Sequence, residues 1–333
     1  MSRTAENSYY SGPVSDHFNG RRFFNPGGPG PKSFGDLARW QFTTRAAAWP
    51  DAYPSPYPAT TPAARLGMSE TRLTAIGHAS CLIQTGGLNI LFDPVYAERA
   101  SPVQFAGPKR VNAPGIAFDA LPKIDVLLVS HNHYDHLDTA VVNRLWLRDR
   151  PLVVTPLGND AIMRAETPDL MARPLDWGQN VDLPGGVVIH CVPTQHWSAR
   201  GTRDRQHALW ASFVIAGPRH TLYIVGDSGF GDGSTFRHVA ARFPAIDVAW
   251  LPIGAYEPRW FMSDQHMNPA ESVTALGLVG ARRALGHHWG TFKLTNEAID
   301  APARELENAC SSAGLAPRRF MAVRPGEILT LDI

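Results

Sequence analysis

The chain has 333 residues, 44% of them hydrophobic, and its 31 basic and 30 acidic residues give a formal net charge of +1. This composition excludes a chain that is disordered throughout, and it provides no global basic field that would favour a nucleic-acid partner. Three cysteines at positions 81, 191 and 310 form no CxxC motif and no even set for disulfides, so we expect a reducing compartment. We expect a cytoplasmic protein with at most peripheral membrane contact, because we find no signal-peptide core and no run of roughly 18 apolar residues.

The first 70 residues are rich in proline, glycine and aromatic residues, which excludes long regular elements there. One short helix is expected over residues 34–44. Because tryptophan and phenylalanine favour packing over a free linker, we interpret residues 1–70 as an arm that packs on a main domain at 71–333.

Short β-rich runs separated by helical segments follow from Arg72 to the C-terminus. We predict one helix after Asp138 and another after Asn268, because both residues are suited to cap a helix N-terminus. A third helix is predicted over residues 297–313, irregular at Pro302. This order favours an α/β protein with mixed sheets and helices on their outer faces.

The strongest chemical signal is the segment 130–136, SHNHYDH, which follows a buried strand at 124–129. It places His131, His133, Asp135 and His136 in one strand-to-helix turn. Packing alone explains such a cluster poorly, because each buried imidazole needs a hydrogen-bond partner. Imidazole and carboxylate are also the ligands that zinc prefers in open catalytic sites.

Three further residues of ligand type follow later apolar runs: His196, Asp227 and His288. Open α/β folds place their sites at the carboxyl ends of strands, so we expect these residues to join the histidine cluster. Taken singly, each has a simpler interpretation as a surface histidine or a turn aspartate. The prediction depends on their appearance together.

The HxHxDH pattern with a later His, Asp and His resembles the metallo-β-lactamase superfamily. More specific segments make residues 70–310 similar to the N-acyl-phosphatidylethanolamine-hydrolysing phospholipase D family. They are GHAS (77–80), FDP (92–94), SPVQFAGPKR (101–110), SHNHYDHLD (130–138), QHW (195–197), GDSG (226–229), PIGAYEPRWFM (252–262) and HWGTF (288–292). The resemblance implies an αββα four-layer sandwich of two mixed β-sheets with outer helices.

The resemblance also implies a site with two Zn²⁺ ions, for which Mn²⁺ or Fe could substitute. It assigns one ion to His131, His133 and His196, and the other to Asp135, His136 and His288, with Asp227 as the bridge. Asp93 is expected to orient a ligand histidine. His78 is expected near the site, where a purely structural role is equally compatible with the sequence, and His287 is the weaker candidate beside His288.

For catalysis, we expect the metals to activate a water that Asp227 steers, and Asp135 is a further candidate catalytic residue. His266 is a candidate to protonate the leaving group. Candidate substrate-binding residues are Tyr134, Trp197, Tyr256 and Gln265, although packing or turn roles also fit Tyr256, Gln265 and His266.

The favoured function is a phospholipase D-type phosphodiesterase that cleaves N-acyl-phosphatidylethanolamine or a related phosphodiester. One alternative is a lactonase of the ascorbate-6-phosphate type, in which Arg110, Arg203 or Arg259 would clamp a phosphate. Another is a non-catalytic metal- or lipid-binding protein, against which the complete ligand set argues. The resemblance also suggests a homodimer.

Overall fold

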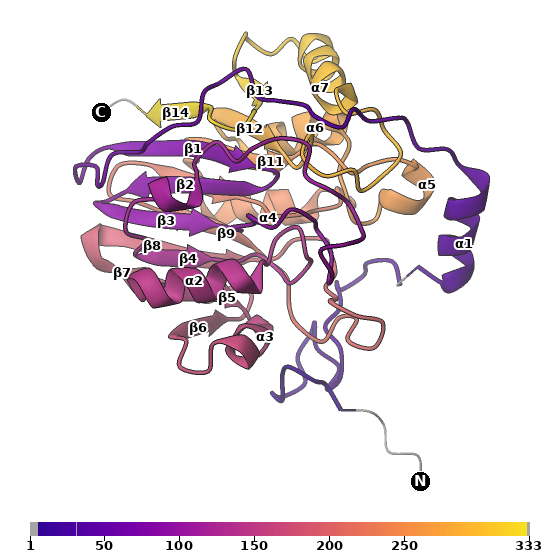
Figure 1. Cartoon of the computed structure of the whole chain (residues 1–333), viewed down its shortest axis with the longest axis horizontal. Helices are drawn as coiled ribbons and strands as arrows, with labels where there is room; N and C mark the ends of the chain where they lie inside the picture. The colour runs from indigo at the N-terminus through magenta and orange to yellow at the C-terminus, as the bar shows by residue number, and fades with distance from the viewer. Residues whose placement is uncertain (1–5, 31, 332–333) are drawn as a thin grey trace.

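Two seven-stranded mixed sheets form the centre of the computed structural model, which describes residues 6–30 and 32–331 (Figure 1). In spatial order, the first sheet contains β14 (Ile328–Leu331), β1 (Thr71–Gly77), β2 (Ser80–Thr85), β3 (Leu88–Phe92), β4 (Val126–Leu128), β5 (Leu152–Pro156) and β6 (Ala172–Leu175). The second contains β13 (Phe320–Ala322), β12 (Arg283–His287), β11 (Val248–Pro252), β10 (Thr221–Ile224), β9 (Ser212–Ala216), β8 (Val187–Val192) and β7 (Asn180–Leu183). Strands β3 to β6 and β10 to β13 pair in parallel, and the other pairs are antiparallel.

Helices cover the outer face of each sheet. The covering helices are α2 (Thr139–Asp149), α3 (Asn159–Glu166), α4 (Ser234–Arg242), α6 (Pro269–Val279) and α7 (Ala301–Ser312). Helices α1 (Phe34–Thr43) and α5 (Arg259–Met262) lie to one side of the sheets (Figure 1). Side chains of α2 and α3 pack on the first sheet, those of α4, α6 and α7 pack on the second, and a third core fills the space between the sheets. The layering confirms the predicted αββα sandwich. None of the helices in the described chain is long and apolar enough to cross a membrane.

The helix caps explain where two predicted helices begin. Asp138 accepts a hydrogen bond from the backbone of Val141, and Asn268 forms a reciprocal capping box with Glu271. The prediction for the third helix was wrong at its start, because α7 begins only at Ala301. Pro302 then falls in the first turn, where the missing N–H costs no intrahelical bond.

Part of the N-terminal arm packs on the segment that precedes β9. Phe18 and Phe23 are buried against Leu209 and Trp210. The Phe23 N–H also donates to the Gln206 carbonyl at 2.9 Å. Contacts of this kind agree with an arm that packs on its neighbour, while the division of the chain at residue 70 stays a prediction.

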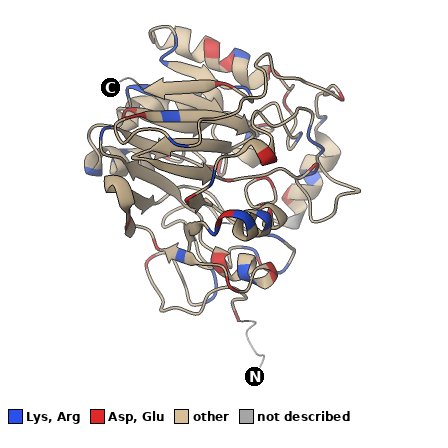
Figure 2. Ribbon diagram, turned by 60° about the vertical axis from the view of Figure 1, so that its left-hand side comes forward, with Lys and Arg blue, Asp and Glu red and all other residues tan. Residues whose placement is uncertain are grey.

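Figure 2 shows basic and acidic residues scattered over the outer helices and loops, whereas the central strands are mostly uncharged. This distribution follows the near balance of 31 basic and 30 acidic residues in the sequence. The expectation that nucleic acid is not a partner stays a prediction.

We expect the N-terminal arm to pack less stably as pH rises, because the His17 ring lies between the carboxylates of Asp16 and Asp176. Its Nδ1 lies 2.5 Å from the Asp16 carboxylate and its Nε2 lies 2.7 Å from that of Asp176. Burial lowers the pKa of His17, but these hydrogen bonds outweigh it and raise the pKa above 6.5. A raised native pKa gives stability that is complete below 6.5 and is lost as pH rises through the native value.

We therefore expect hydrogen exchange of residues 15–24 to be slower at pH 5.5 than at pH 8.5, after correction for intrinsic exchange rates. In His17→Gln, the same comparison should show a much smaller pH effect. An equal pH effect in both proteins would contradict the role of His17.

Candidate metal centre

Residues from several loops converge where strands of both sheets end. The turn that carries residues 131–136 follows β4, His196 follows β8, Asp227 follows β10 and His288 follows β12. Strand ends that share one edge of a sandwich bring side chains together from distant parts of the sequence. The structure thus gathers the predicted ligands in one buried place.

The backbone around this place adopts conformations that most residues avoid. His78, Asp93 and His288 have φ angles of 53°, 39° and 67°, in the left-handed region. Each such residue costs on the order of 1–3 kcal/mol, and such strain persists where surrounding contacts fix it. Close approach matters too, because a Cβ on Gly226 would overlap the Ser130 hydroxyl.

The first group of side chains contains His131, His133, His196 and Asp227. The Nδ1 of His133 lies 2.9 Å from His131 Nε2 and 3.2 Å from His196 Nε2. The Asp227 Oδ2 lies 3.8 Å from the His131 nitrogen and 3.5 Å from the His196 nitrogen. Three imidazole nitrogens that converge on one point cannot all be satisfied by a single shared proton.

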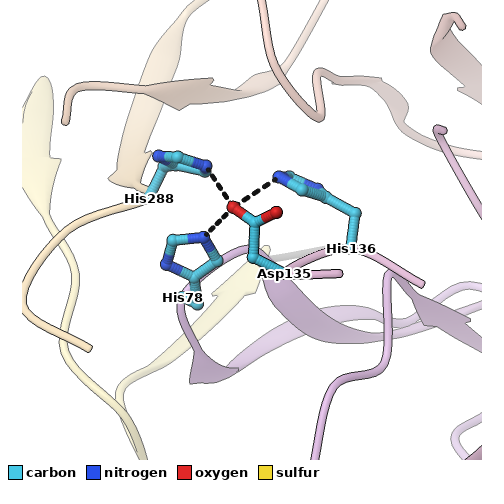
Figure 3. Close-up of side chains that lie close together, drawn as sticks. All are labelled: His78, Asp135, His136 and His288. Carbon is cyan, nitrogen blue, oxygen red and sulfur yellow. Dashed lines mark hydrogen bonds and ion pairs between the residues drawn. The ribbon is translucent and has the colours of Figure 1, made fainter. Parts of the chain in front are cut away.

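The second group surrounds Asp135 (Figure 3). Its Oδ2 lies 3.0 Å from His78 Nε2, 3.3 Å from His288 Nε2 and 3.7 Å from His136 Nε2. His78 therefore contacts Asp135 directly, whereas the sequence predicted only that His78 would lie near the site.

Asp227 contacts both groups. Its Oδ2 lies 3.2 Å from His136 Nε2, and its Oδ1 lies 3.0 Å from His288 Nε2. The same carboxylate also faces the three histidines of the first group. This is the geometry that a bridging ligand requires.

The surroundings of the first group keep its imidazoles neutral, so that their nitrogen lone pairs can bind a metal. Burial, reinforced by neighbouring imidazoles, holds the pKa of His131 and His196 well below the usual value. Burial also lowers the pKa of His133 to about 4. All three rings are then neutral near pH 7, as metal coordination requires.

In the second group, carboxylates outweigh burial and raise the pKa of two of its histidines. Burial lowers the pKa of His136 and His288, but the Asp227 and Asp135 carboxylates raise that of His288 to about 9 and that of His136 well above normal. The carboxylates thus draw positive charge into this buried position. Divalent cations would supply that charge and displace these protons.

The donor set and its unsatisfied atoms fit two metal ions. The Nε2 atoms of His136 and His288 and the Oδ1 of Asp227 are buried and lie 3.0–3.2 Å from a partner atom, but none of them makes a hydrogen bond of good geometry in the described structure. Within each of the two groups, one ligand atom per residue lies within 4.8 Å of all the others. Unpaired buried polar atoms are rare in native proteins unless an ion or water satisfies them. The clusters are consistent with a dinuclear metal site.

A supporting layer holds the candidate ligands in place. The Asp93 Oδ2 lies 2.7 Å from His136 Nδ1 and accepts a hydrogen bond of 2.6 Å from the Ser130 hydroxyl. That hydroxyl is in turn 2.9 Å from His131 Nδ1. On the other side, His196 Nδ1 lies 2.9 Å from the Gln265 carbonyl. Such partners fix the orientation of metal-binding imidazoles.

Replacing Asp93 by Asn should weaken metal binding by roughly 10–100-fold, the usual cost of removing such a partner. The amide keeps the shape of the carboxylate but loses the charge that it presents to His136. Competition with a chromogenic chelator measures the affinity of each metal position. If Asp93→Asn holds both metals as tightly as the parent protein, the proposed support of His136 is wrong.

The structure brings several predicted substrate residues to the site. His266 Nδ1 lies 4.0 Å from Asp227 Oδ2, and burial lowers the pKa of His266 to about 4, which favours a neutral hydrogen-bonding ring over an acid. The Trp197 ring packs 4.5 Å from the His133 ring, and Gln265 contacts His196 through its carbonyl. Tyr134 donates its hydroxyl to the Arg200 carbonyl at 3.0 Å.

Tyr256 has a buried side chain, which is 2% exposed, and its hydroxyl has no hydrogen-bond partner in the described structure. Burial and the nearby Glu305 carboxylate on α7 raise the pKa of this hydroxyl. No hydrogen bond joins Tyr256 to the candidate ligands in the described structure. The expected role of Tyr256 in substrate binding therefore gains no support from its position.

The arginines expected to clamp a phosphate have other surroundings. Arg110 donates to the Val95 carbonyl at 2.6 Å, and Arg259 forms a bidentate pair with Glu271 at 2.8 Å. Arg203 is exposed. Arg259 is therefore already paired with a carboxylate, whereas the Nη1 atom of Arg110 is buried without a hydrogen-bond partner in the described structure.

Two other arginines, Arg200 and Arg205, were missed by sequence reasoning. Arg200 donates to the carbonyls of Asn132 and Leu137 at 3.0 and 2.9 Å, which braces the turn that carries the histidine cluster. Arg205 lies 4.1 Å above the Trp197 ring. The nearby QHW segment was the signal that could have drawn attention to both.

Comparisons with known proteins agree with this geometry. A family model described as a beta-lactamase superfamily domain matches residues 88–289. The N-acyl-phosphatidylethanolamine-hydrolyzing phospholipase D 1 of Caenorhabditis elegans is 37% identical over 266 residues, which cover 77% of this chain and 74% of the worm protein. The chain belongs to the metallo-β-lactamase superfamily.

A second sequence relative and a solved structure add to these comparisons. The mitochondrial N-acyl-phosphatidylethanolamine-hydrolyzing phospholipase D of Saccharomyces cerevisiae is 32% identical over 74% of this chain and 53% of the yeast protein. The fold matches the crystal structure of isothiocyanate hydrolase from Delia radicum gut bacteria with a TM-score of 0.62 at 20% identity, covering 78% of this chain and 98% of that one. The sequence relatives and the buried His/Asp clusters identify a metal-dependent hydrolase of this superfamily.

Proposed function

We propose that the protein is a phospholipase D-type phosphodiesterase that cleaves N-acyl-phosphatidylethanolamine or a closely related phosphodiester. The main support is the 37% identity to a phospholipase of that name across about three quarters of both chains. The bridging position of Asp227 between two ligand groups suits a two-metal hydrolase. The imidazole-carboxylate donor set favours zinc, although manganese or iron could bind the same ligands.

Two divalent cations at this place would activate a water and neutralise charge on the phosphoryl oxygens. The Asp227 carboxylate would orient that water toward phosphorus. His266, 4.0 Å from Asp227, would donate a hydrogen bond to the leaving alcohol oxygen or to another oxygen on the same phosphorus. In the overall reaction, an oxygen of water bonds to phosphorus and the bond from phosphorus to the N-acylethanolamine oxygen breaks. One proton of that water ends on the leaving oxygen, so the products are phosphatidic acid and the neutral N-acylethanolamine.

The surface around α1 and α5 supports a lipid substrate. Phe42 is 88% exposed and Trp260 is 36% exposed, and Arg39 lies 4.5 Å over the Trp260 ring. Exposed apolar side chains beside cations suit the interface of an anionic membrane. We propose peripheral membrane contact on this side.

The test is product analysis by mass spectrometry after metal-loaded protein meets N-acyl-phosphatidylethanolamine in detergent micelles containing ¹⁸O-water. We expect N-acylethanolamine and phosphatidic acid that carries one ¹⁸O atom, and neither product after chelator treatment. If protein shown to contain two metals yields no product, the substrate is wrong and the hydrolase assignment stands. Phosphorylated sugar lactones are then the next substrates to assay.

A further inference from the structure

A small hollow of about 30 Å³, open to solvent, lies beside the candidate ligand His196. Residues of the N-terminal arm form one wall, and the loops that follow β8 and α5 form the others. The lining residues are Asn25, Pro29, Gly30, Lys32, His196, Trp197, Arg205, Gln206, Asp264 and Gln265. Its position beside the metal centre makes it a place for a part of the substrate that does not react.

Two basic side chains line this hollow, and only one of them has an acidic partner. Lys32 lies 2.5 Å from the Asp264 carboxylate and is neutralised by it. Arg205 has no carboxylate within 4.0 Å in the described chain, and its Nε is buried without a hydrogen-bond partner there. A cation that is partly removed from water and unpaired is costly, and an anion that arrives with a ligand would offset that cost.

The guanidinium is also held in position. It lies 4.1 Å over the Trp197 ring, which packs 4.5 Å from the His133 ring. The next residue, Gln206, accepts the Phe23 N–H and donates its own N–H to the Ser198 carbonyl at 2.7 Å. Stacking on an indole leaves the edge of a guanidinium free to bind oxygen atoms.

We propose that Arg205 is a specificity-determining residue that binds a second anionic group of the substrate, a carboxylate or a phosphate, beside the scissile phosphodiester. The proposal rests on the proposed function. The reacting phosphodiester belongs at Asp227, whereas the Trp197 ring lies between Arg205 and the histidines. The anion at Arg205 is therefore a separate substituent of the substrate.

Calorimetric titration of metal-loaded protein tests this with three ligands that share one acyl chain: N-acylserine, O-phosphorylated N-acylethanolamine and neutral N-acylethanolamine. We expect an anionic ligand to bind about tenfold or more tightly than the neutral one, the usual range for a charged hydrogen bond. The carboxylate and phosphate ligands show which anion the hollow prefers. Arg205→Gln should abolish the preference, and Arg205→Lys should keep part of it.

Arg21→Gln is the matched control, because it removes an exposed positive charge from the neighbouring arm. It should leave the preference unchanged, and thermal unfolding should show that all variants are folded. Equal binding of the three ligands by the parent protein, or an undiminished preference in Arg205→Gln, overturns the proposal. Because the ligands are not cleaved as phosphodiesters, this result is readable even if the proposed phospholipase activity is absent.

A kinetic comparison completes the test where turnover is found. N-acyl-phosphatidylserine carries a headgroup carboxylate that N-acyl-phosphatidylethanolamine lacks. If the carboxylate is the preferred anion, Arg205→Gln should raise KM for the serine lipid by a larger factor than KM for the ethanolamine lipid. An equal loss on both lipids would indicate a general structural role instead.

Discussion

Asp227→Asn should reduce kcat/KM for any substrate of this enzyme by on the order of 100-fold or more. Removing a group that only orients a metal ligand already costs about 10–100-fold. Asp227 does more, because its two oxygens lie 3.0–3.5 Å from histidine nitrogens of both ligand groups. The amide keeps the size of the side chain but loses the charge that two cations share.

Steady-state kinetics on the purified variant, with metal content measured by plasma emission spectrometry, test this expectation. Circular dichroism should match the parent protein, because asparagine preserves the packing of a side chain that is 2% exposed. Near-normal turnover with two metals bound would refute the bridging role. Loss of one metal with partial activity would instead place Asp227 in a single ligand group.

The largest effect on stability is expected for Phe23→Ala. Phe23 is 0% exposed and packs with Phe18 at 4.6 Å between ring centroids, against Leu209 and Trp210. Truncating a buried phenylalanine to alanine costs about 3–5 kcal/mol through lost transfer energy and a residual cavity. A loss of this size should undock the arm, which forms one wall of the hollow beside His196.

Denaturant unfolding combined with hydrogen exchange of residues 15–30 measures both the global and the local effect. Phe42→Ala is the matched control, because the same truncation is made where the ring is 88% exposed. It should change the unfolding free energy by less than about 0.5 kcal/mol. Similar losses in both variants would mean that the arm contributes no specific packing.

Local chemistry made part of the fold predictable. Asp138 and Asn268 cap α2 and α6 as their side chains indicated, since a cap needs only the few residues beside it. Strand β7 has no β-rich sequence signal, because a short polar run such as Asn180–Leu183 becomes a strand only by pairing with a neighbour. Helix α4 lacks a side-chain cap at Gly233, so no local signal marked its start.

The site shows the same limit. The histidine cluster was visible because its residues are adjacent in sequence, and the structure joins it to Asp227 and His288 as strand ends suggested. Their roles as metal ligands stay predictions. Tyr256 and Arg205 could not be judged beforehand, because the sequence does not give the direction of a side chain: the structure buries that of Tyr256 and stacks that of Arg205 on Trp197.

The two ligand groups draw on both sheets, so the order in which the chain is synthesised matters. The turn at 131–136 emerges from the ribosome long before His288, which follows β12. A nascent chain that has not reached residue 288 lacks a member of the group around Asp135. Tight binding of both ions can then occur only after most of the second sheet has been synthesised. Metal binding would therefore stabilise a fold that has already formed and would not nucleate it.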